Sequence, residues 1–314
     1  MSTLKRPLSR EELRQFMVRR PALTTTKFLG VVLAMVGLTW VAWNARSPWI
    51  DWPAYIALGY LWMSVVTFMH DATHDSLFKH KWQNMAFGIL TMVPLMVSFV
   101  TFKEDHLEHH RHNRSPKDPD AFTMGRRGFL DFLTFYLYFA VGGVLTAIHF
   151  GLIYPIKRFG VRNWAIHLFE LGLKAAGYTA LVFWAMENGV LGKTLAVWLY
   201  PVLFFSLFNS LRFIAEHYGT PWNQGNLMGT RTVVSNPVHS FFWNNINWHI
   251  GHHVYPKVPW HNLVALHHRI EPEIVALGAV VDPSYVGVCW NALRCGPENE
   301  ARTAAHYPPM VAGR

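Results

Sequence analysis

The chain has 314 residues, of which 51% are hydrophobic and only 15% are charged, with 22 Phe and 14 Trp. This apolar, aromatic-rich composition argues against an ordinary soluble enzyme and predicts an integral membrane protein. Two cysteines, Cys289 and Cys295, exclude a disulfide framework and make a thiolate metal site improbable, and the net charge of +9 is not accompanied by any nucleic-acid-binding motif.

The N-terminal segment, residues 1–26, is basic, and the first apolar run follows it directly. Positive charge that flanks a membrane helix stays in the cytoplasm, so we expect a cytoplasmic N-terminus. The segment is too long and too basic for a cleaved signal peptide, and the first apolar run should remain as an anchor. The basic residues before or at the start of that run are Lys5, Arg6, Arg10, Arg14, Arg19, Arg20 and Lys27.

Six apolar runs are candidates for membrane helices, because a bilayer core of ~30 Å takes about 20 residues of helix. The first two runs and the last two are each joined by a short segment, which predicts two helical hairpins and hence four transmembrane helices. The hairpin turns should face away from the cytoplasm. The six runs are Lys27–Ala45, Pro53–Met69, Ala86–Phe102, Phe129–Pro155, Trp164–Met186 and Val190–Ile214.

The two middle runs are expected not to cross the membrane. Ala86–Phe102 is short, is broken by Pro94 and separates two histidine clusters that must share one face, so we predict a re-entrant or interfacial segment. Phe129–Pro155 has basic stretches at both ends, which places both ends in the cytoplasm and predicts an interfacial helix or helix pair.

The predicted fold class is therefore an all-α integral membrane protein. It has about four transmembrane helices in two hairpins, interfacial helices, and a cytoplasmic cap formed by the polar stretches between and after the runs. We divide the chain into a basic cytoplasmic segment (1–26), a membrane domain with its cap (27–270) and a cytoplasmic C-terminal tail (271–314).

Histidine is the most informative residue type in this chain, which contains 18 of them. Three clusters read HDATH (70–74), HLEHH (106–110) and HIGHH (249–253), and spacings of three and four residues place imidazoles on one face of a helix. One more histidine directly follows the last apolar run. Nine imidazoles are therefore expected to converge: His70, His74, His106, His109, His110, His217, His249, His252 and His253.

The convergence of these nine residues predicts a metal centre. A single histidine beside an apolar segment is usually a hydrogen-bonded structural residue, but nine partly desolvated imidazoles at one membrane surface are costly unless a metal binds them. Imidazole suits zinc, copper, iron and nickel, whereas one zinc ion takes only about four ligands. If two metal ions share the nine imidazoles and keep open positions for O2, iron is the favoured metal.

The remaining histidines beside apolar segments are interpreted as structural. They are His80, His149, His167, His239, His261, His267, His268 and His306.

Carboxylates beside the clusters are candidate acceptors for the second ring nitrogen of ligating imidazoles. Asp118 and Asp120 are instead interpreted as an Asp-Pro turn that orients a loop or pairs with Arg111 or Arg114. The candidate acceptors are Asp71, Asp75, Asp105, Glu108 and Glu216.

The three motifs HDATH, HLEHH and HIGHH, in this order and separated by paired apolar runs, resemble the histidine boxes of the membrane fatty-acid desaturase superfamily. The resemblance spans about Phe28–Leu266 and includes the Asp-Pro-Asp at 118–120, Glu216-His217 and the Asn-Trp-His at 247–249. It implies that the nine histidines are ligands of two iron ions. No catalytic residue beyond the metal ligands is assigned.

The resemblance also implies an O2-dependent di-iron oxidase that acts on a long-chain acyl or lipid substrate, first of all a fatty-acid or acyl-lipid desaturase. A separate ferredoxin, rubredoxin or cytochrome would deliver electrons at the basic cytoplasmic face. The similarity to bacterial members implies the inner membrane, with both termini and the histidine boxes in the cytoplasm.

Several alternatives stay open at this point. Within the superfamily these are a hydroxylase or ketolase of a lipid or carotenoid, and a terminal-alkene-forming fatty-acid decarboxylase. From the residues alone, a membrane zinc hydrolase and a metal-binding or transport protein are further candidates. The chain length and headgroup of the substrate, the carbon that is attacked, the electron donor and the oligomeric state are not determined by the sequence.

Overall fold

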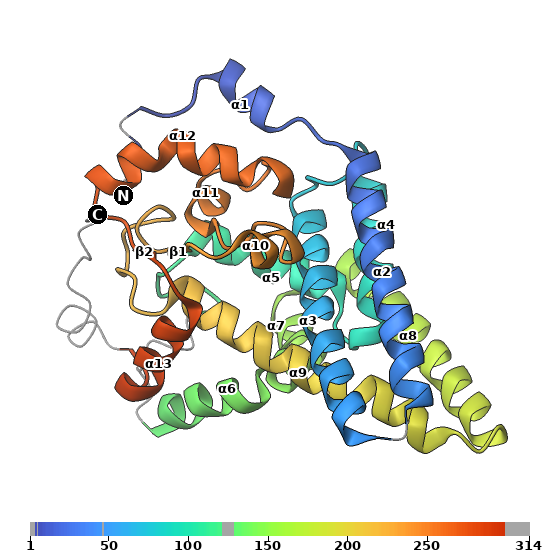
Figure 1. The fold of residues 1–314 in the computed structure, drawn as a ribbon. Coiled ribbons are helices and arrows are strands. Elements are labelled where there is room, and N and C mark those ends of the chain that lie inside the picture. The colour runs from blue at the N-terminus through green and yellow to red at the C-terminus, as the bar shows by residue number, and fades with distance from the viewer. Residues whose placement is uncertain (1–3, 5, 46, 121–128, 299–314) are drawn as a thin grey trace.

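The computed structural model describes residues 4, 6–45, 47–120 and 129–298, and this part of the chain is almost entirely helical (Figure 1). The first half contains α1 (Arg10–Phe16), α2 (Pro21–Asn44), α3 (Pro48–Thr73), α4 (Lys81–Met92), η1 (Val93–Leu95), α5 (Phe99–His112), α6 (Phe129–Ile148), η3 (His149–Ile153) and α7 (Tyr154–Arg158). The second half contains α8 (Val161–Glu187), α9 (Leu191–His217), β1 (Thr232–Val233), α10 (Pro237–Phe242), α11 (His249–Val254), η4 (Trp260–Asn262), α12 (Leu263–Ala276), β2 (Val281–Asp282) and α13 (Tyr285–Cys295).

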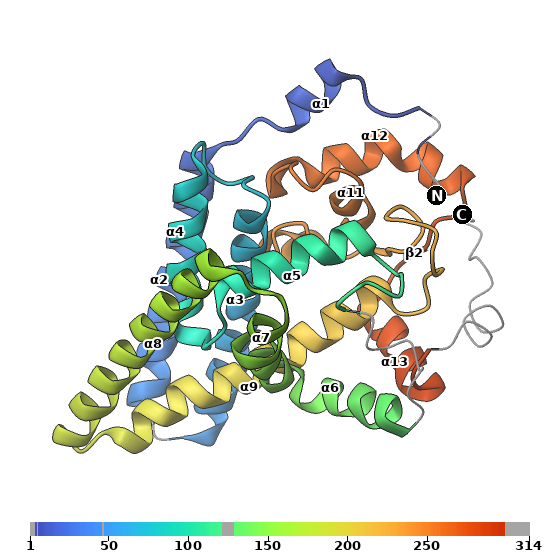
Figure 2. The ribbon, with the colours of Figure 1, turned by 180° about the vertical axis from the view of Figure 1, so that it is seen from behind.

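Two helical hairpins, α2–α3 and α8–α9, lie where the sequence predicts them. Helices α2 and α3 pack along each other, and α8 and α9 diverge from a tight turn at Gly189, whose φ of 64° suits glycine. Figures 1 and 2 show the turns of both hairpins at one end of the molecule and the short helices α10, α11 and α12 at the other. This arrangement confirms an all-α membrane fold with a cap on one side.

Within the described residues, four helical segments are long and apolar enough to cross a membrane: Arg10–Asn44, Pro48–Thr73, Phe132–Arg158 and Leu191–His217. Their number agrees with the prediction, but their identity differs. The third segment overlaps the run that was expected to be interfacial, and by length and composition it qualifies as a span. Helix α8 is as long as α9 but does not qualify, and it carries two charged residues, Glu170 and Lys174, within its apolar stretch.

The segment between the first two histidine clusters is bent, as Pro94 within it suggests. Residues Lys81–Leu95 and Phe99–His112 form two helical arms at 109° to each other. His74 precedes this segment and His106 lies in its second arm, yet their Nε2 atoms are 3.0 Å apart. The two histidine clusters on either side of this segment therefore lie side by side, and the re-entrant course stays a prediction.

Helix α8 fixes the start of α5 through a buried carboxylate. The oxygens of Glu170 accept hydrogen bonds from the backbone N–H groups of Phe99 (2.6 Å) and Val100 (2.9 Å) in the first turn of α5. These amides have no partner within the helix, and a negative charge at a helix N-terminus is favourable. Lys174 lies 3.4 Å from the same carboxylate. Glu170 and Lys174, which make α8 less hydrophobic, thus stabilise the start of α5, the helix that carries the second histidine cluster.

The cap is held to the membrane helices by contacts from both ends of the chain. Lys27 of α2 donates to Asn244 Oδ1 (2.5 Å) and lies over the ring of Trp260 (4.0 Å). Near the other end, the carboxylate of Glu298 pairs with the guanidinium of Arg114 at 2.8 Å. Described residues near both ends of the chain therefore pack against the rest of the structure, and the backbone N–H of Arg6 also donates to Glu273 (2.9 Å).

Replacing Glu170 by Ala should lower the free energy of unfolding by about 3 kcal/mol, because it leaves Lys174 buried without its partner and removes the cap of α5. Thermal unfolding of the detergent-solubilised protein measures this loss. Glu187→Ala, at the exposed end of the same helix, is the matched control and should melt like the unchanged protein. Equal melting temperatures for the two variants would contradict the capping role.

Candidate metal centre

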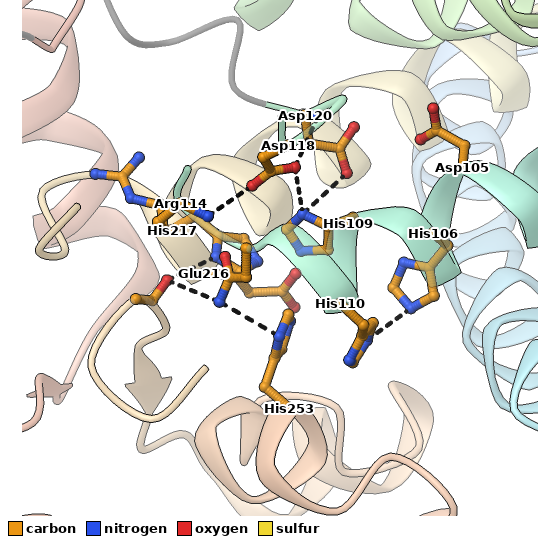
Figure 3. A network of polar contacts seen from close by, with 12 residues as sticks. Asp105, His106, His109, His110, Arg114, Asp118, Asp120, Glu216, His217 and His253 are labelled. Carbon is orange, nitrogen blue, oxygen red and sulfur yellow. Dashed lines mark hydrogen bonds and ion pairs between the residues drawn. The ribbon is translucent and has the colours of Figure 1, made fainter. Parts of the chain in front are cut away.

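The nine histidines expected to converge lie together in one buried cluster. They come from the end of α3, from α5, from the last residue of α9 and from α11, and each is at most 8% exposed. Figure 3 shows several of these side chains pointing toward one another from separate elements. The requirement that all three motifs share one face is therefore met.

Local backbone geometry explains how the motifs reach this point. Helix α3 ends at Thr73, and Asp75 then adopts a positive φ of 56°, which turns the chain away from the cluster. The short α11 follows Asn244 and Asn245, whose φ angles are 52° and 56°. Asparagine tolerates this left-handed region better than most residues do. The third motif is thus delivered by a turn and not by a long helix.

The ring nitrogens form two adjoining groups. In the first group, one nitrogen of each histidine lies within 4.8 Å of the others: His70, His74, His106, His110 and His252. The second group contains His109, His217 and His253, and Glu216 and His249 join it through His217. The cluster therefore offers two neighbouring positions for a metal ion, and each position has imidazole ligands from several elements.

The contacts within the cluster fit metal ligands better than they fit a hydrogen-bond network. The Nε2 atoms of His106 and His110 are 3.0 Å apart, and those of His110 and His252 are 3.1 Å apart. A neutral imidazole has one N–H donor, so one ring cannot satisfy several such contacts. The Nε2 atom of His70 is buried without any hydrogen-bond partner. A cation bound between the rings would satisfy all of these lone pairs.

Burial also keeps most of these imidazoles in the neutral form that a metal requires. It lowers the pKa of His74 to about 3, and it lowers the pKa of His106 and His252 well below the usual value. His109 is different. Burial lowers its pKa too, but the charge and hydrogen bond of Asp118 outweigh burial and raise the pKa to about 9.

Asp118 is the carboxylate that the sequence analysis missed. It was interpreted as part of a turn, but its Oδ1 atom accepts the Nδ1–H of His109 at 2.9 Å (Figure 3). Its other oxygen accepts the backbone N–H of Arg114 at 2.8 Å, which fixes the carboxylate. Asp120 lies 3.6 Å from the same nitrogen. No spacing rule links residues nine positions apart on a helix and the loop behind it, so only the structure could reveal this pair.

Two of the five carboxylates proposed as acceptors contact a histidine of the cluster. Asp71 Oδ1 lies 3.3 Å from the Nδ1 of His70, and Glu216 Oε2 lies 3.4 Å from the Nε2 of His249. The first contact leaves Nε2 of His70 facing the cluster. The second places Glu216 on the same side as the ring nitrogens, where it is itself a possible ligand.

The other three proposed acceptors have different partners. Asp75 pairs with Lys103, and Glu108 pairs with Arg111 and His112. Asp105 contacts His149 at 3.2 Å, a histidine to which a structural role was assigned. These carboxylates therefore stabilise α5 and its surroundings and do not contact the nine histidines.

A cavity adjoins the cluster. It touches His70 and His106 of the first group and His109, His217 and His249 of the second. Apolar side chains of α3, the bent segment, η3 and α9 line much of the rest: Val66, Met69, Met92, Val97, Phe150 and Phe205. An apolar chain in this cavity would lie next to both metal positions.

Comparison with known proteins agrees with this geometry. The sequence model of the family "Fatty acid desaturase" matches residues 46–285. The chain is 26% identical over 283 residues to the human fatty acid desaturase 3, with 82% of this chain and 62% of that protein covered. It is 25% identical over 254 residues to an sn-1 oleoyl-lipid 12-desaturase of Arthrospira platensis, with 74% and 71% covered.

A third relative is the sphingolipid delta(4)-desaturase/C4-monooxygenase of Rattus norvegicus, which is 24% identical over 242 residues, with 74% of this chain and 69% of that protein covered. The chain covers 62% of the human relative, which is somewhat less than two thirds of that protein. The region matched by the family model, residues 46–285, contains all nine clustered histidines and the adjoining cavity. The chain belongs to the fatty acid desaturase family.

Proposed function

We propose that this protein is an O2-dependent oxidase with a di-iron centre that acts on a long acyl chain, as a fatty-acid or acyl-lipid desaturase. The observation that carries the proposal is the contact between the nine-histidine cluster and an apolar cavity inside a membrane protein of this family. The name of the rat relative joins a desaturase and a monooxygenase. Hydroxylation therefore remains the second candidate outcome.

The proposed ligands are the nine histidines in their two groups, with Glu216 beside the second. Nine imidazoles exceed what one zinc ion takes, and their division into two groups supports two metal ions with room for a further ligand. An iron pair held there would supply the activation of O2 and the oxidation of an unactivated C–H bond.

The protein itself contributes orientation and exclusion of water. Asp118 accepts the Nδ1–H of His109 and keeps the proton at that atom, so that Nε2 remains free to bind a metal. Asp71 is placed to do the same for His70. Because all nine rings are buried, few water molecules compete for the metal, and the apolar wall of the cavity holds the acyl chain against the cluster.

We further propose a cytoplasmic location for the cluster and both termini, in a bacterial inner membrane, with a separate ferredoxin, rubredoxin or cytochrome as electron donor. The basic N-terminal segment supports this orientation. The net charge of +9 favours an acidic electron carrier, and coupling between the two proteins should weaken as salt concentration rises.

Metal analysis tests the centre itself. The purified protein should contain about two irons per chain and consume O2 only when a reductant and a lipid substrate are present. His252→Ala and His109→Ala should each lose iron and activity, because each change removes a proposed ligand. Elemental analysis by mass spectrometry, together with an oxygen electrode, measures both properties.

His268→Ala is the matched control, since this ring is 62% exposed and lies outside the cluster. It should retain full iron content and activity. A protein that contains mostly zinc, or that acts without O2, would refute the oxidase proposal and favour a zinc hydrolase. Full activity in His252→Ala would refute the ligand assignment.

Asp118→Ala should lower metal affinity or activity by about 10- to 100-fold, because His109 loses the acceptor that fixes its ring. Asp118→Asn keeps an oxygen acceptor and should lose less. Iron content after dialysis against a chelator reports the difference. The exposed Glu271→Ala serves as control, and a loss of equal size in that variant would show that the effect is not specific to His109.

A further inference from the structure

One arginine side chain lines the cavity beside the cluster. Among the described residues that line the cavity, Arg212 of α9 is the single arginine or lysine, and it is 8% exposed. A buried guanidinium is costly unless a negative charge and hydrogen-bond acceptors surround it. Its surroundings therefore indicate what the cavity binds.

Arg212 is only partly satisfied by the protein. Its Nη1 atom lies 3.3 Å from Glu216 Oε1, one helical turn further along α9, as an ion pair. The Nε and Nη1 atoms nevertheless have no hydrogen-bond acceptor, although both are buried. A guanidinium can donate two parallel hydrogen bonds to one carboxylate, so this side chain has the capacity to bind a second anion.

The acidic side chains of the cavity do not remove this capacity. Asp105 contacts His149 (3.2 Å), Asp120 lies near His109 (3.6 Å), and Glu216 contacts His249 (3.4 Å) as well as Arg212. Each carboxylate thus has an imidazole neighbour of its own. Apart from ring nitrogens of the histidine cluster, the guanidinium of Arg212 is the group among the described residues of the cavity that has buried N–H donors without acceptors.

The order of residues along α9 indicates which end of a bound acyl chain lies near the histidine cluster. Phe205, Arg212 and Glu216 all line the cavity, and Glu216 is the one that contacts the histidine cluster. Arg212 therefore lies between the apolar end of the cavity and the metal positions. A carboxylate on Arg212 would extend its alkyl chain toward Phe205 and Met92 and keep its first carbons beside the cluster.

We propose that Arg212 binds the carboxylate of a free fatty acid inside the cavity, with the carbons next to the carboxyl group nearest to the histidine cluster. The proposal rests on the proposed function and names its substrate class as an unesterified acid. A thioester or a glycerolipid ester has no charged oxygen pair at this position. Its bulky headgroup would also have to fit in the space between Arg212 and the cluster.

Binding of hexadecanoic acid, compared with hexadecan-1-ol and methyl hexadecanoate, tests the proposal. The measurement uses the purified, metal-loaded full chain under anaerobic conditions, so that binding is read without turnover. The acid should bind at least about 10-fold more tightly than the alcohol or the ester, because only the acid forms a charge-assisted pair with Arg212.

Arg212→Met should weaken binding of the acid by about 10- to 100-fold and leave binding of the alcohol almost unchanged. Arg212→Lys keeps the charge but loses the paired donors, and its loss should be intermediate. Arg162→Met removes an exposed arginine at the start of α8 and is the matched control. Equal loss for acid and alcohol in Arg212→Met would overturn the proposal.

If Arg212→Met does not fold, as judged by gel filtration and thermal unfolding, the comparison of acid, alcohol and ester on the unchanged protein decides the question. Equal affinity for the three would refute the proposal. Failure of the oxidase function is read separately, from iron content and O2 consumption. A protein that prefers the acid but contains no iron would support the Arg212 site and refute the di-iron proposal.

Discussion

The structure depends on one constraint: nine imidazoles share a space that excludes water. The Nε2 atoms of six of them approach one another to 3.0–3.2 Å, and burial favours the neutral form of most of the rings. Rings in this state repel through their lone pairs unless a cation lies between them. The two hairpins, the bent segment and the turn before α11 can all be understood as the means by which distant parts of the chain meet at this point.

The polar residues of the membrane helices serve the same end. Glu170 of α8 caps the helix that carries His106, and Arg212 and Glu216 of α9 lie between the cavity and the cluster. Such residues are expensive in a bilayer and are normally turned toward the interior of the protein. Helix α9 runs from the apolar part of the protein to the histidine cluster. Several of its residues line the cavity, and its last residue, His217, belongs to the cluster.

Periodic and local features could be predicted from the sequence, and long-range pairs could not. The i, i+3 and i, i+4 spacing identified the clustered histidines, and the need for one shared face predicted the return of the chain at Pro94. Asp118 lies in a turn and contacts Arg114, as predicted, but its contact with His109 across the loop was not predicted. The partners of Glu170 are 70 and 71 positions away in the chain, so no local pattern marks this residue. The choice of spans also differed, because the basic flanks of residues 129–155 favoured an interfacial helix although Phe132–Arg158 is long and apolar enough to cross a membrane.

The wide spread of the cluster along the chain has a consequence for biosynthesis. The first five histidines have been translated by residue 110, whereas the turn that delivers α11 lies beyond residue 243, and the Arg114 side chain finds its counter-ion only at Glu298. A nascent chain therefore exposes an incomplete set of ligands while its hairpins enter the bilayer. The buried cluster can therefore be complete only after residue 253 has been translated.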